Sequence, residues 1–271
     1  MGKIAFNKIF GKALAYPFSR KDVLLVFFLV NLIFSFLGWY ITNTMFNLSD
    51  FSLTTEKFIE FIFYVLPINI IGWIFWIFLM PMYLENSIHF YKGKRKPLFE
   101  SFEASKKRFL PVLGIFIIFG LLILACFGGF LLVIYAVISG SDLTLIGLAG
   151  LWFIIGSVIG VVLMFFFFLS PVVCVFEKAR SLESFKKSFQ LVSKNKLSTS
   201  LFFIIIILMF FAISIIGSIP ELIYGFFVGL PTPLSISDLS FMIIRTFVTS
   251  YLGLFFYASF AFYYLNLKRK I

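Results

Sequence analysis

The sequence predicts an all-α fold: a polytopic integral membrane protein with six transmembrane helices. We expect these helices to form three hairpins, each preceded by a cytoplasmic amphipathic helix. Composition is the first reason, because 61% of the 271 residues are hydrophobic and only 13% are charged, whereas soluble domains carry about 25% charged residues. The placement of charge is the second, because 21 of the 23 Lys and Arg residues lie in four segments that alternate with long apolar runs. The composition excludes a soluble globular domain.

Six apolar runs are long enough to cross the hydrocarbon core as helices, which takes about 20 residues each. Helices are expected because unpaired backbone groups are costly in lipid. The alternating pattern of membrane β-strands is also absent from the sequence. The predicted spans are residues 23–46, 58–83, 109–138, 145–176, 201–223 and 241–265.

The charges also predict an orientation in the membrane. Cytoplasmic loops of membrane proteins are enriched in Lys and Arg, and the four basic segments here are residues 1–22, 92–108, 178–196 and 268–270. The intervening loops instead carry acidic residues, namely Asp50, Glu56, Glu60, Asp142, Glu221 and Asp238. We therefore expect a location in the cell membrane with both the N- and C-termini in the cytoplasm.

Each of the first three basic segments contains apolar residues at helical spacing with basic residues between them, which is typical of a helix lying in the membrane interface. The alternative is an ordinary short loop with some helix content. The candidate lipid-facing basic residues are Lys8, Lys12, Lys106, Lys107, Arg108, Lys186 and Lys187. We expect membrane lipids as partners, with other membrane proteins as a second class. Nucleic acid is not expected, although the formal net charge is +11, because anionic headgroups are the nearer counterpart of this charge.

A short match within the chain indicates an internal repeat. Glu-Ser-Phe occurs at residues 100–102 and again at 183–185, a period of 83 residues, and internal duplication is common in membrane proteins. We therefore expect a single membrane domain, residues 1–271, built from repeat units of about 1–90, 91–180 and 181–271.

Two blocks of sequence resemble a known family. The first is Lys-Ala-Leu-Ala-Tyr-Pro at residues 12–17, and the second runs from Ser-Pro-Val-Val at 170–173 through Glu177 and Ser-Phe-Lys-Lys-Ser at 184–188 to Asn195. They are similar to an uncharacterised prokaryotic family of six-span membrane proteins of unknown function, which we expect to be archaeal. The blocks also resemble the membrane domain of glycerophosphodiester phosphodiesterases. The resemblance implies no catalytic residues, and we expect the chain to lack the soluble phosphodiesterase domain.

The sequence offers little material for catalysis. His89 is the single histidine, which excludes histidine-based metal clusters and Ser-His-Asp triads. Glu85 and His89 share one helical face and would be a proton-handling pair or simply an interfacial polar face. Glu85, His89 and Glu177 are the only residues that could contribute to a cytoplasmic acid–base site. We therefore predict no catalytic, cofactor-binding or metal-binding residues, no cofactor, and no enzymatic activity.

Few polar residues lie within the predicted spans. Asn31 and Asn69 are expected to form hydrogen bonds between helices rather than to contact a ligand. Arg245 lies near the outer end of the sixth span, where its side chain can extend to the interface. Glu221 or Asp238 could pair with it, and an anion site is the alternative interpretation.

Glycines are concentrated in the fourth predicted span. Gly156 and Gly160 are four residues apart, and Gly147 and Gly150 precede them. Small residues at this spacing allow the backbones of two membrane helices to approach closely. We therefore expect a tight helix–helix contact here rather than a functional hinge.

Three functions fit the pattern. The first is a non-enzymatic membrane protein that organises lipids or partner proteins at the cytoplasmic face. The second is a transporter or channel for an apolar or lipid-like substrate, for which repeats and proline-broken spans are typical. The third is a membrane enzyme acting on lipid headgroups. The sequence favours them in that order because ionisable residues are nearly absent from the spans.

Overall fold

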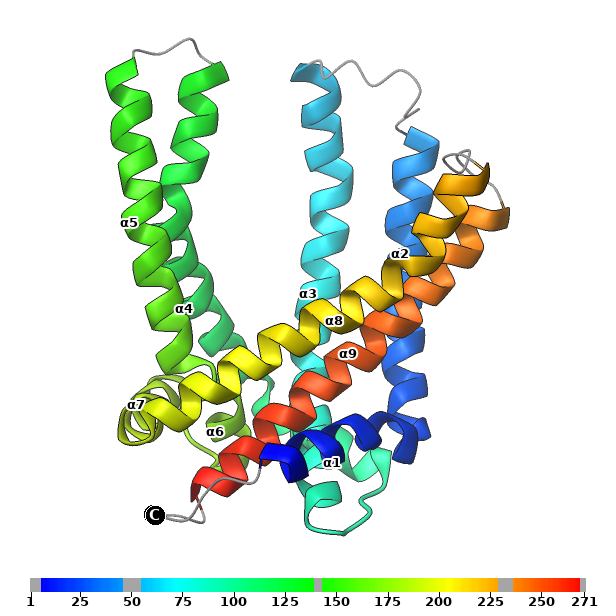
Figure 1. The fold of residues 1–271 in the computed structure, drawn as a ribbon, viewed down its shortest axis with the longest axis vertical. Helices are drawn as coiled ribbons and strands as arrows, with labels where there is room; N and C mark the ends of the chain where they lie inside the picture. The colour runs from blue at the N-terminus through cyan, green and yellow to red at the C-terminus, as the bar shows by residue number, and fades with distance from the viewer. Residues whose placement is uncertain (1–5, 46–54, 139–142, 229–235, 269–271) are drawn as a thin grey trace. The chain divides into compact units, whose positions relative to one another are not determined.

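A computed structural model describes residues 6–45, 55–138, 143–228 and 236–268. This part of the chain contains nine helices and no strands (Figure 1), which confirms the all-α class. The helices are α1 (Phe6–Ser19), α2 (Lys21–Met45), α3 (Thr55–Tyr91), α4 (Leu98–Ile138), α5 (Leu143–Phe167), α6 (Ser170–Phe176), α7 (Ser181–Lys194), α8 (Lys196–Val228) and α9 (Ile236–Lys268).

Six segments of the described helices are long and apolar enough to cross a membrane, which indicates a multi-pass membrane protein. They are Lys21–Tyr40, Leu66–Tyr91, Leu98–Cys126, Thr144–Phe176, Lys196–Ile215 and Leu239–Lys268. Each overlaps one predicted span. The helices themselves extend beyond most of the predicted spans, because the flanking polar residues continue the helix without contributing to the apolar signal.

Two local predictions differ from the structure. The second amphipathic stretch and the third span were expected as separate elements, but they form the single helix α4. The fourth span was predicted as one segment, residues 145–176, but it comprises two helices, because α5 ends at Phe167 and α6 begins at Ser170. Pro171 explains the break, because it has no N–H to donate to the carbonyl four residues earlier and its ring collides with that carbonyl.

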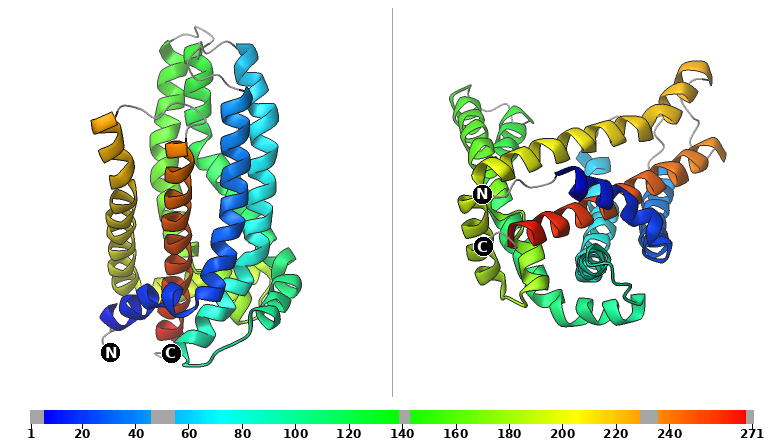
Figure 2. Two further views of the ribbon diagram at one scale, coloured as in Figure 1. Left: turned by 90° about the vertical axis from the view of Figure 1, so that its right-hand side faces the viewer. Right: turned by 60° about the horizontal axis from the view of Figure 1, so that its bottom comes forward.

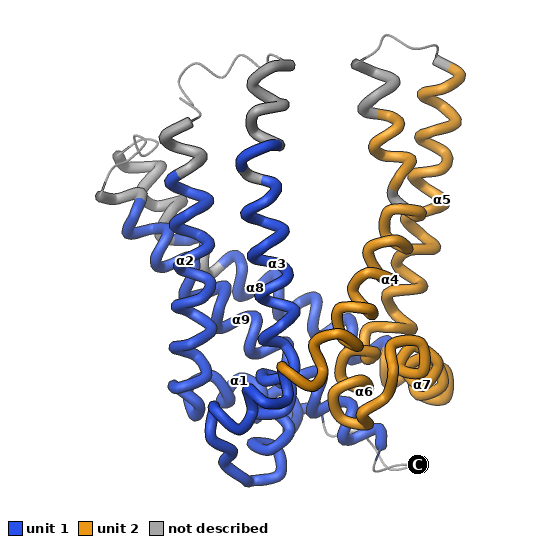
Figure 3. The backbone as a smooth tube through the Cα atoms, turned by 180° about the vertical axis from the view of Figure 1, so that it is seen from behind, with its two compact units in different colours: residues 1–105, 200–271 blue, residues 106–199 orange. Residues whose placement is uncertain are grey.

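The chain forms two compact units (Figure 3). Unit 1 comprises Met1–Ser105 and Ser200–Ile271, and unit 2 comprises Lys106–Thr199. Unit 1 therefore contains α1, α2, α3, α9 and most of α8, while α5, α6, α7 and most of α4 belong to unit 2. The three repeat units stay a prediction.

Helix α9 is the element around which unit 1 is built, because it packs against α1, α2 and α3. Helix α1 runs across the end of α2 rather than continuing it (Figure 2). The hydroxyl of Tyr251 on α9 donates a hydrogen bond of 2.9 Å to the carbonyl oxygen of Leu14 on α1. Asn31 Nδ2 on α2 donates a bond of 3.0 Å to Ser250 Oγ on α9, which confirms the predicted interhelical role of Asn31.

Aromatic rings fill the core of unit 1 where α1, α3, α8 and α9 meet. Phe202 and Tyr263 stack with their ring centroids 4.1 Å apart, and Tyr91 lies 4.7 Å from Phe262. Buried aromatic pairs add packing energy beyond their apolar area. This core fixes the start of α2 and the end of α3, which carry the candidate site.

In unit 2, α4 and α5 approach each other closely at a glycine. A methyl group added at Gly156 would collide with the carbonyl oxygen of Cys126, so the predicted close contact is confirmed at this residue. The prediction was wrong for Gly147 and Gly150, where a methyl group would meet no atom within 4 Å. The close approach is therefore confined to part of the glycine-rich stretch.

Candidate anion-binding pocket

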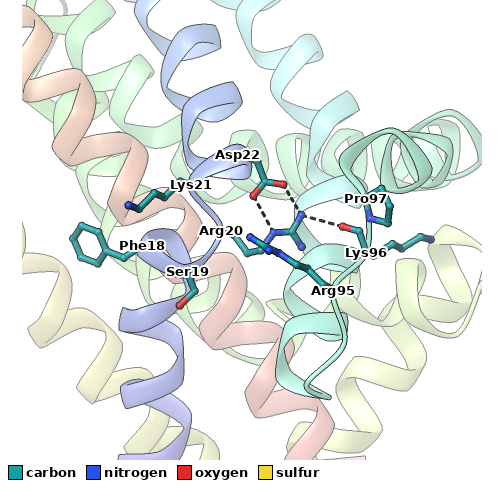
Figure 4. A pocket seen from close by; sticks show the side chains of 8 residues that line it. All are labelled: Phe18, Ser19, Arg20, Lys21, Asp22, Arg95, Lys96 and Pro97. Atoms are coloured by element: carbon teal, nitrogen blue, oxygen red, sulfur yellow. Dashed lines mark hydrogen bonds and ion pairs between the residues drawn. The ribbon is translucent and has the colours of Figure 1, made fainter.

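A cavity of about 490 Å³ lies in unit 1, beside the turn that joins α1 to α2. Figure 4 shows the side chains that surround it, and four of the eight are cationic. Two separate stretches of chain contribute, the α1–α2 turn and the loop between α3 and α4. The lining residues are Phe18, Ser19, Arg20, Lys21, Asp22, Arg95, Lys96 and Pro97. We call this cavity the Arg20 pocket.

The local sequence explains why the turn takes this form. Helix α1 ends at Ser19, and Asp22 lies in the first turn of α2. A carboxylate there interacts favourably with the unpaired N–H groups and positive dipole of a helix start. The carbonyl oxygen of Arg20 accepts bonds from the amides of Val23 and Leu24. Arg20 is therefore held at the junction of the two helices.

Arg20 is the buried centre of the pocket, with a side chain only 2% exposed. Its Nε lies 3.0 Å from Asp22 Oδ1, and its Nη2 lies 2.8 Å from Asp22 Oδ2. Nη2 also donates a 3.0 Å bond to the carbonyl oxygen of Lys96. The remaining nitrogen, Nη1, is buried without a hydrogen-bond partner. A buried donor without a partner is costly, so Nη1 is an unsatisfied donor at the buried centre of the pocket.

The charge of Arg20 is permanent. Its hydrogen bonds to Asp22 raise the pKa of the guanidinium, and this effect exceeds the opposing effect of burial. Arginine is already cationic throughout the physiological range. The pocket therefore keeps this cation at every physiological pH.

The Arg20 pocket carries more positive charge than its acidic neighbours balance. Asp22 pairs with Arg20, and Lys96 Nζ lies 2.7 Å from Glu85 Oε1 on α3. Lys21 and Arg95 are exposed and form no ion pair among the described residues. Two cations are thus left beside the unpaired guanidinium nitrogen. Hydrogen bonds from cationic side chains to phosphate or carboxylate groups are stronger than those between neutral groups, so the two exposed cations suit an oxyanion.

The predicted lipid-facing residues divide by exposure. Lys12 is half-buried, and its Nζ lies 4.7 Å from the ring centroid of Tyr91 and 3.4 Å from the Tyr91 carbonyl oxygen. This ammonium group interacts with the core of unit 1. Four of the seven predicted residues are exposed, namely Lys8, Lys106, Lys107 and Lys186.

The last two predicted residues interact with protein groups in unit 2. Arg108 Nη1 donates a 3.1 Å bond to the carbonyl oxygen of Lys178. Lys187 Nζ lies 2.9 Å from Glu177 Oε2 and 2.7 Å from Glu183 Oε1. These ion pairs raise the pKa of Lys187 and lower the pKa of Glu183. Lys187 is therefore partly neutralised by the protein.

The residues considered for acid–base chemistry also have structural partners. His89 Nδ1 lies 2.9 Å from the backbone carbonyl oxygen of Glu85, so Nδ1 carries the proton and donates it. The carboxylate of Glu85 instead pairs with Lys96. Glu177 belongs to unit 2 and pairs with Lys187. His89 thus contacts the backbone of Glu85, whereas the carboxylate of Glu85 is paired with Lys96.

Sequence reasoning did not select Arg20, Lys21, Arg95 or Lys96. Each lies in a basic segment, but the sequence alone assigned those segments to orientation. One signal was present: Arg20 stands two residues before Asp22 at a helix junction, a spacing that suits a local ion pair. The contact between Arg20 and Lys96 joins residues 76 positions apart and has no signature in the local sequence.

Comparison with known proteins identifies a family. Residues 106–267 match a family described as a domain of unknown function (DUF7847). The match covers unit 2, α8 and nearly all of α9, whereas the Arg20 pocket precedes it. No curated protein and no solved structure matches the chain. The archaeal origin and the relation to glycerophosphodiester phosphodiesterases stay predictions. Because the match covers more than half of the chain, the protein belongs to the DUF7847 family.

Proposed function

We propose that the protein is a non-enzymatic membrane protein that binds and organises anionic lipids at the cytoplasmic face of the cell membrane. The observation that carries this proposal is the Arg20 pocket, where a buried guanidinium keeps one unpartnered nitrogen beside two unbalanced cations. The pocket lies next to Lys21, the first residue of a candidate span. A phosphodiester headgroup is the oxyanion that is abundant at such a position.

The proposed orientation supports the same conclusion. Arg20 and Arg95 belong to two of the basic segments, and such segments are retained in the cytoplasm. With both termini inside, the six spans pair into three hairpins whose basic ends all face the cytoplasm. Basic side chains near the membrane surface attract anionic lipids by about 1 kcal/mol each.

Helix α7 fits an interfacial position. The buried face of α7 carries Phe185 and Val192, whereas Leu182 and Phe189 on the same helix are 74% and 47% exposed. Lys186 lies between these two exposed apolar residues in the sequence. Interfacial helices place apolar side chains at the acyl boundary and lysines in the aqueous layer. On this basis α7 lies along the membrane surface.

The lining of the Arg20 pocket suits binding better than chemistry. Its single carboxylate, Asp22, accepts hydrogen bonds from Nε and Nη2 of Arg20, so it is not positioned to take a proton from a substrate. The pocket lining contains no histidine. Transport of an apolar or lipid-like substrate stays the alternative prediction.

The charge of the pocket can be removed without touching its buried centre. Lys21→Gln combined with Arg95→Gln is expected to lower the affinity for phosphatidylglycerol at least tenfold, because both exposed cations are lost. Native mass spectrometry of the full chain in detergent would measure the number of retained lipids. The control is Arg180→Gln with Lys194→Gln, which removes two exposed cations elsewhere. Equal lipid retention by both double variants would contradict the proposal.

Orientation gives a separate prediction. Lys94→Cys is expected to react with a membrane-impermeant maleimide in inside-out vesicles, and Glu56→Cys in intact cells, because the two residues are predicted to face opposite sides. The native Cys126 and Cys174 are buried, so the wild-type protein provides the unlabelled control. Labelling of both introduced cysteines from one side would overturn the proposed topology.

A further inference from the structure

A second cavity in unit 1 lies within the apolar part of the chain. It has a volume of about 380 Å³ and is lined by α2 and α9. Its residues fall within or beside the candidate spans Lys21–Tyr40 and Leu239–Lys268. The lining residues are Asn31, Ser35, Trp39, Phe241, Met242, Arg245, Thr246 and Thr249. Most of these are polar, which is unusual for a segment that faces hydrocarbon.

Hydrogen bonds between α2 and α9 fix the polar wall of this cavity. Thr246 Oγ1 donates a 3.2 Å bond to Ser35 Oγ. Because Ser35 accepts this bond, its own hydroxyl proton stays available to a ligand. Asn31 uses one N–H on Ser250 Oγ and keeps a second. The wall therefore presents donors held by interhelical contacts.

Arg245 adds a cation to these donors. It lies six residues after Leu239, the start of the candidate span, which corresponds to about 9 Å along an α-helix. A charged side chain at such a depth is costly in lipid and usually has a functional partner. The acidic residues considered as its partners from the sequence, Glu221 and Asp238, lie outside the side chains that the structure describes.

The remaining walls are apolar. Trp39 and Phe241 supply aromatic surface, and Met242 supplies a flexible thioether side chain. A cavity with a few convergent polar groups and apolar walls is the usual form of a small-molecule site. The polar wall suits an oxyanion, and the apolar walls suit the hydrocarbon attached to it.

We propose that this cavity binds the oxyanionic headgroup, a phosphate or a carboxylate, of a membrane amphiphile. Arg245 neutralises the headgroup, Ser35 and Asn31 donate hydrogen bonds to it, and Trp39 and Phe241 contact the adjoining apolar portion. The site is separate from the Arg20 pocket, and it does not depend on the function proposed above.

The test counts bound molecules on the full chain in detergent by native mass spectrometry, with phosphatidylglycerol and oleate as probes. Arg245→Gln is expected to bind the amphiphile at this site at least tenfold more weakly and therefore to retain one molecule fewer. Arg245→Lys is expected to keep most of the affinity. Arg180→Gln is the control that removes an equal charge elsewhere. Equal retention by Arg245→Gln and the control would overturn the proposal. The Lys21→Gln, Arg95→Gln double variant should keep the molecule at this site, which separates the two proposals.

A local measurement does not depend on the stability of the Arg245 variant. In a protein whose other three tryptophans are replaced by Phe, the emission of Trp39 should shift when phosphatidylglycerol or oleate is added. Inorganic phosphate at the same concentration should leave the emission unchanged. A response to phosphate alone would assign the cavity to a soluble anion and overturn the proposal of a membrane amphiphile. An unchanged emission with all three probes would also overturn the proposal.

Discussion

Gly156→Ala is expected to destabilise unit 2 by about 1–3 kcal/mol, the usual cost of adding a methyl group to a tightly packed contact. The added methyl group would collide with the backbone carbonyl of Cys126. A backbone atom cannot move aside as a side chain can, so α4 and α5 must separate. Their separation would also stretch the 3.1 Å bond from Trp152 Nε1 to the carbonyl oxygen of Ala125.

The cysteines of unit 2 provide the measurement for this prediction. Cys126 and Cys174 are both buried, so a thiol-reactive fluorophore reports the temperature at which unit 2 opens in detergent. Gly147→Ala is the matched control, because it is the same substitution in the same helix with open space around it. A shared opening temperature for the two variants would show that the α4–α5 contact is not tight at Gly156.

Arg20→Ala is expected to abolish the stabilisation that anionic lipid gives to unit 1. A ligand at about one hundred times its dissociation constant stabilises a folded protein by about 2.7 kcal/mol. The variant should also lose about 1–3 kcal/mol without lipid, because Asp22 loses its partner and the carbonyl of Lys96 loses a donor. Thermal unfolding followed by tryptophan fluorescence, with and without phosphatidylglycerol, measures both effects.

Two further variants identify the cause of that loss. Arg20→Lys keeps the charge but not the paired N–H geometry, so an intermediate response to lipid is expected. Arg180→Ala removes an exposed arginine elsewhere and should respond as the wild-type protein does. A normal lipid response in Arg20→Ala would assign the buried arginine to folding alone and remove the central support for the proposed function.

The helical class and the number of spans could be predicted because both depend on composition and on run length. The ends of the helices could be predicted less well. The run before Phe176 is apolar on both sides of the break, so hydropathy hid the effect of Pro171, although the proline itself was visible. Conversely, α4 continues through Pro111, so proline alone does not decide where a helix ends.

The candidate site could be predicted from the sequence only in outline. Sequence reasoning placed the basic segments beside the spans and selected lysines by their position on a helical face. Partners decide which of these cations can meet a ligand, and partners depend on tertiary structure. Lys12 is placed over the ring of Tyr91, 79 residues away, and Lys187 lies between two glutamates. The pocket around Arg20 is completed by the loop that follows α3. The local sequence pattern around Arg20 could not predict this long-range contact.

The discontinuous composition of unit 1 has a consequence for biogenesis. Ribosomes make α2 and α3 early and α9 last, with the whole of unit 2 translated between them. Asn31 enters the bilayer long before Ser250 exists to accept its hydrogen bond. The nascent hairpin therefore stays in the membrane without this interhelical bond until the final helix arrives, and synthesis of the C-terminal helix completes unit 1.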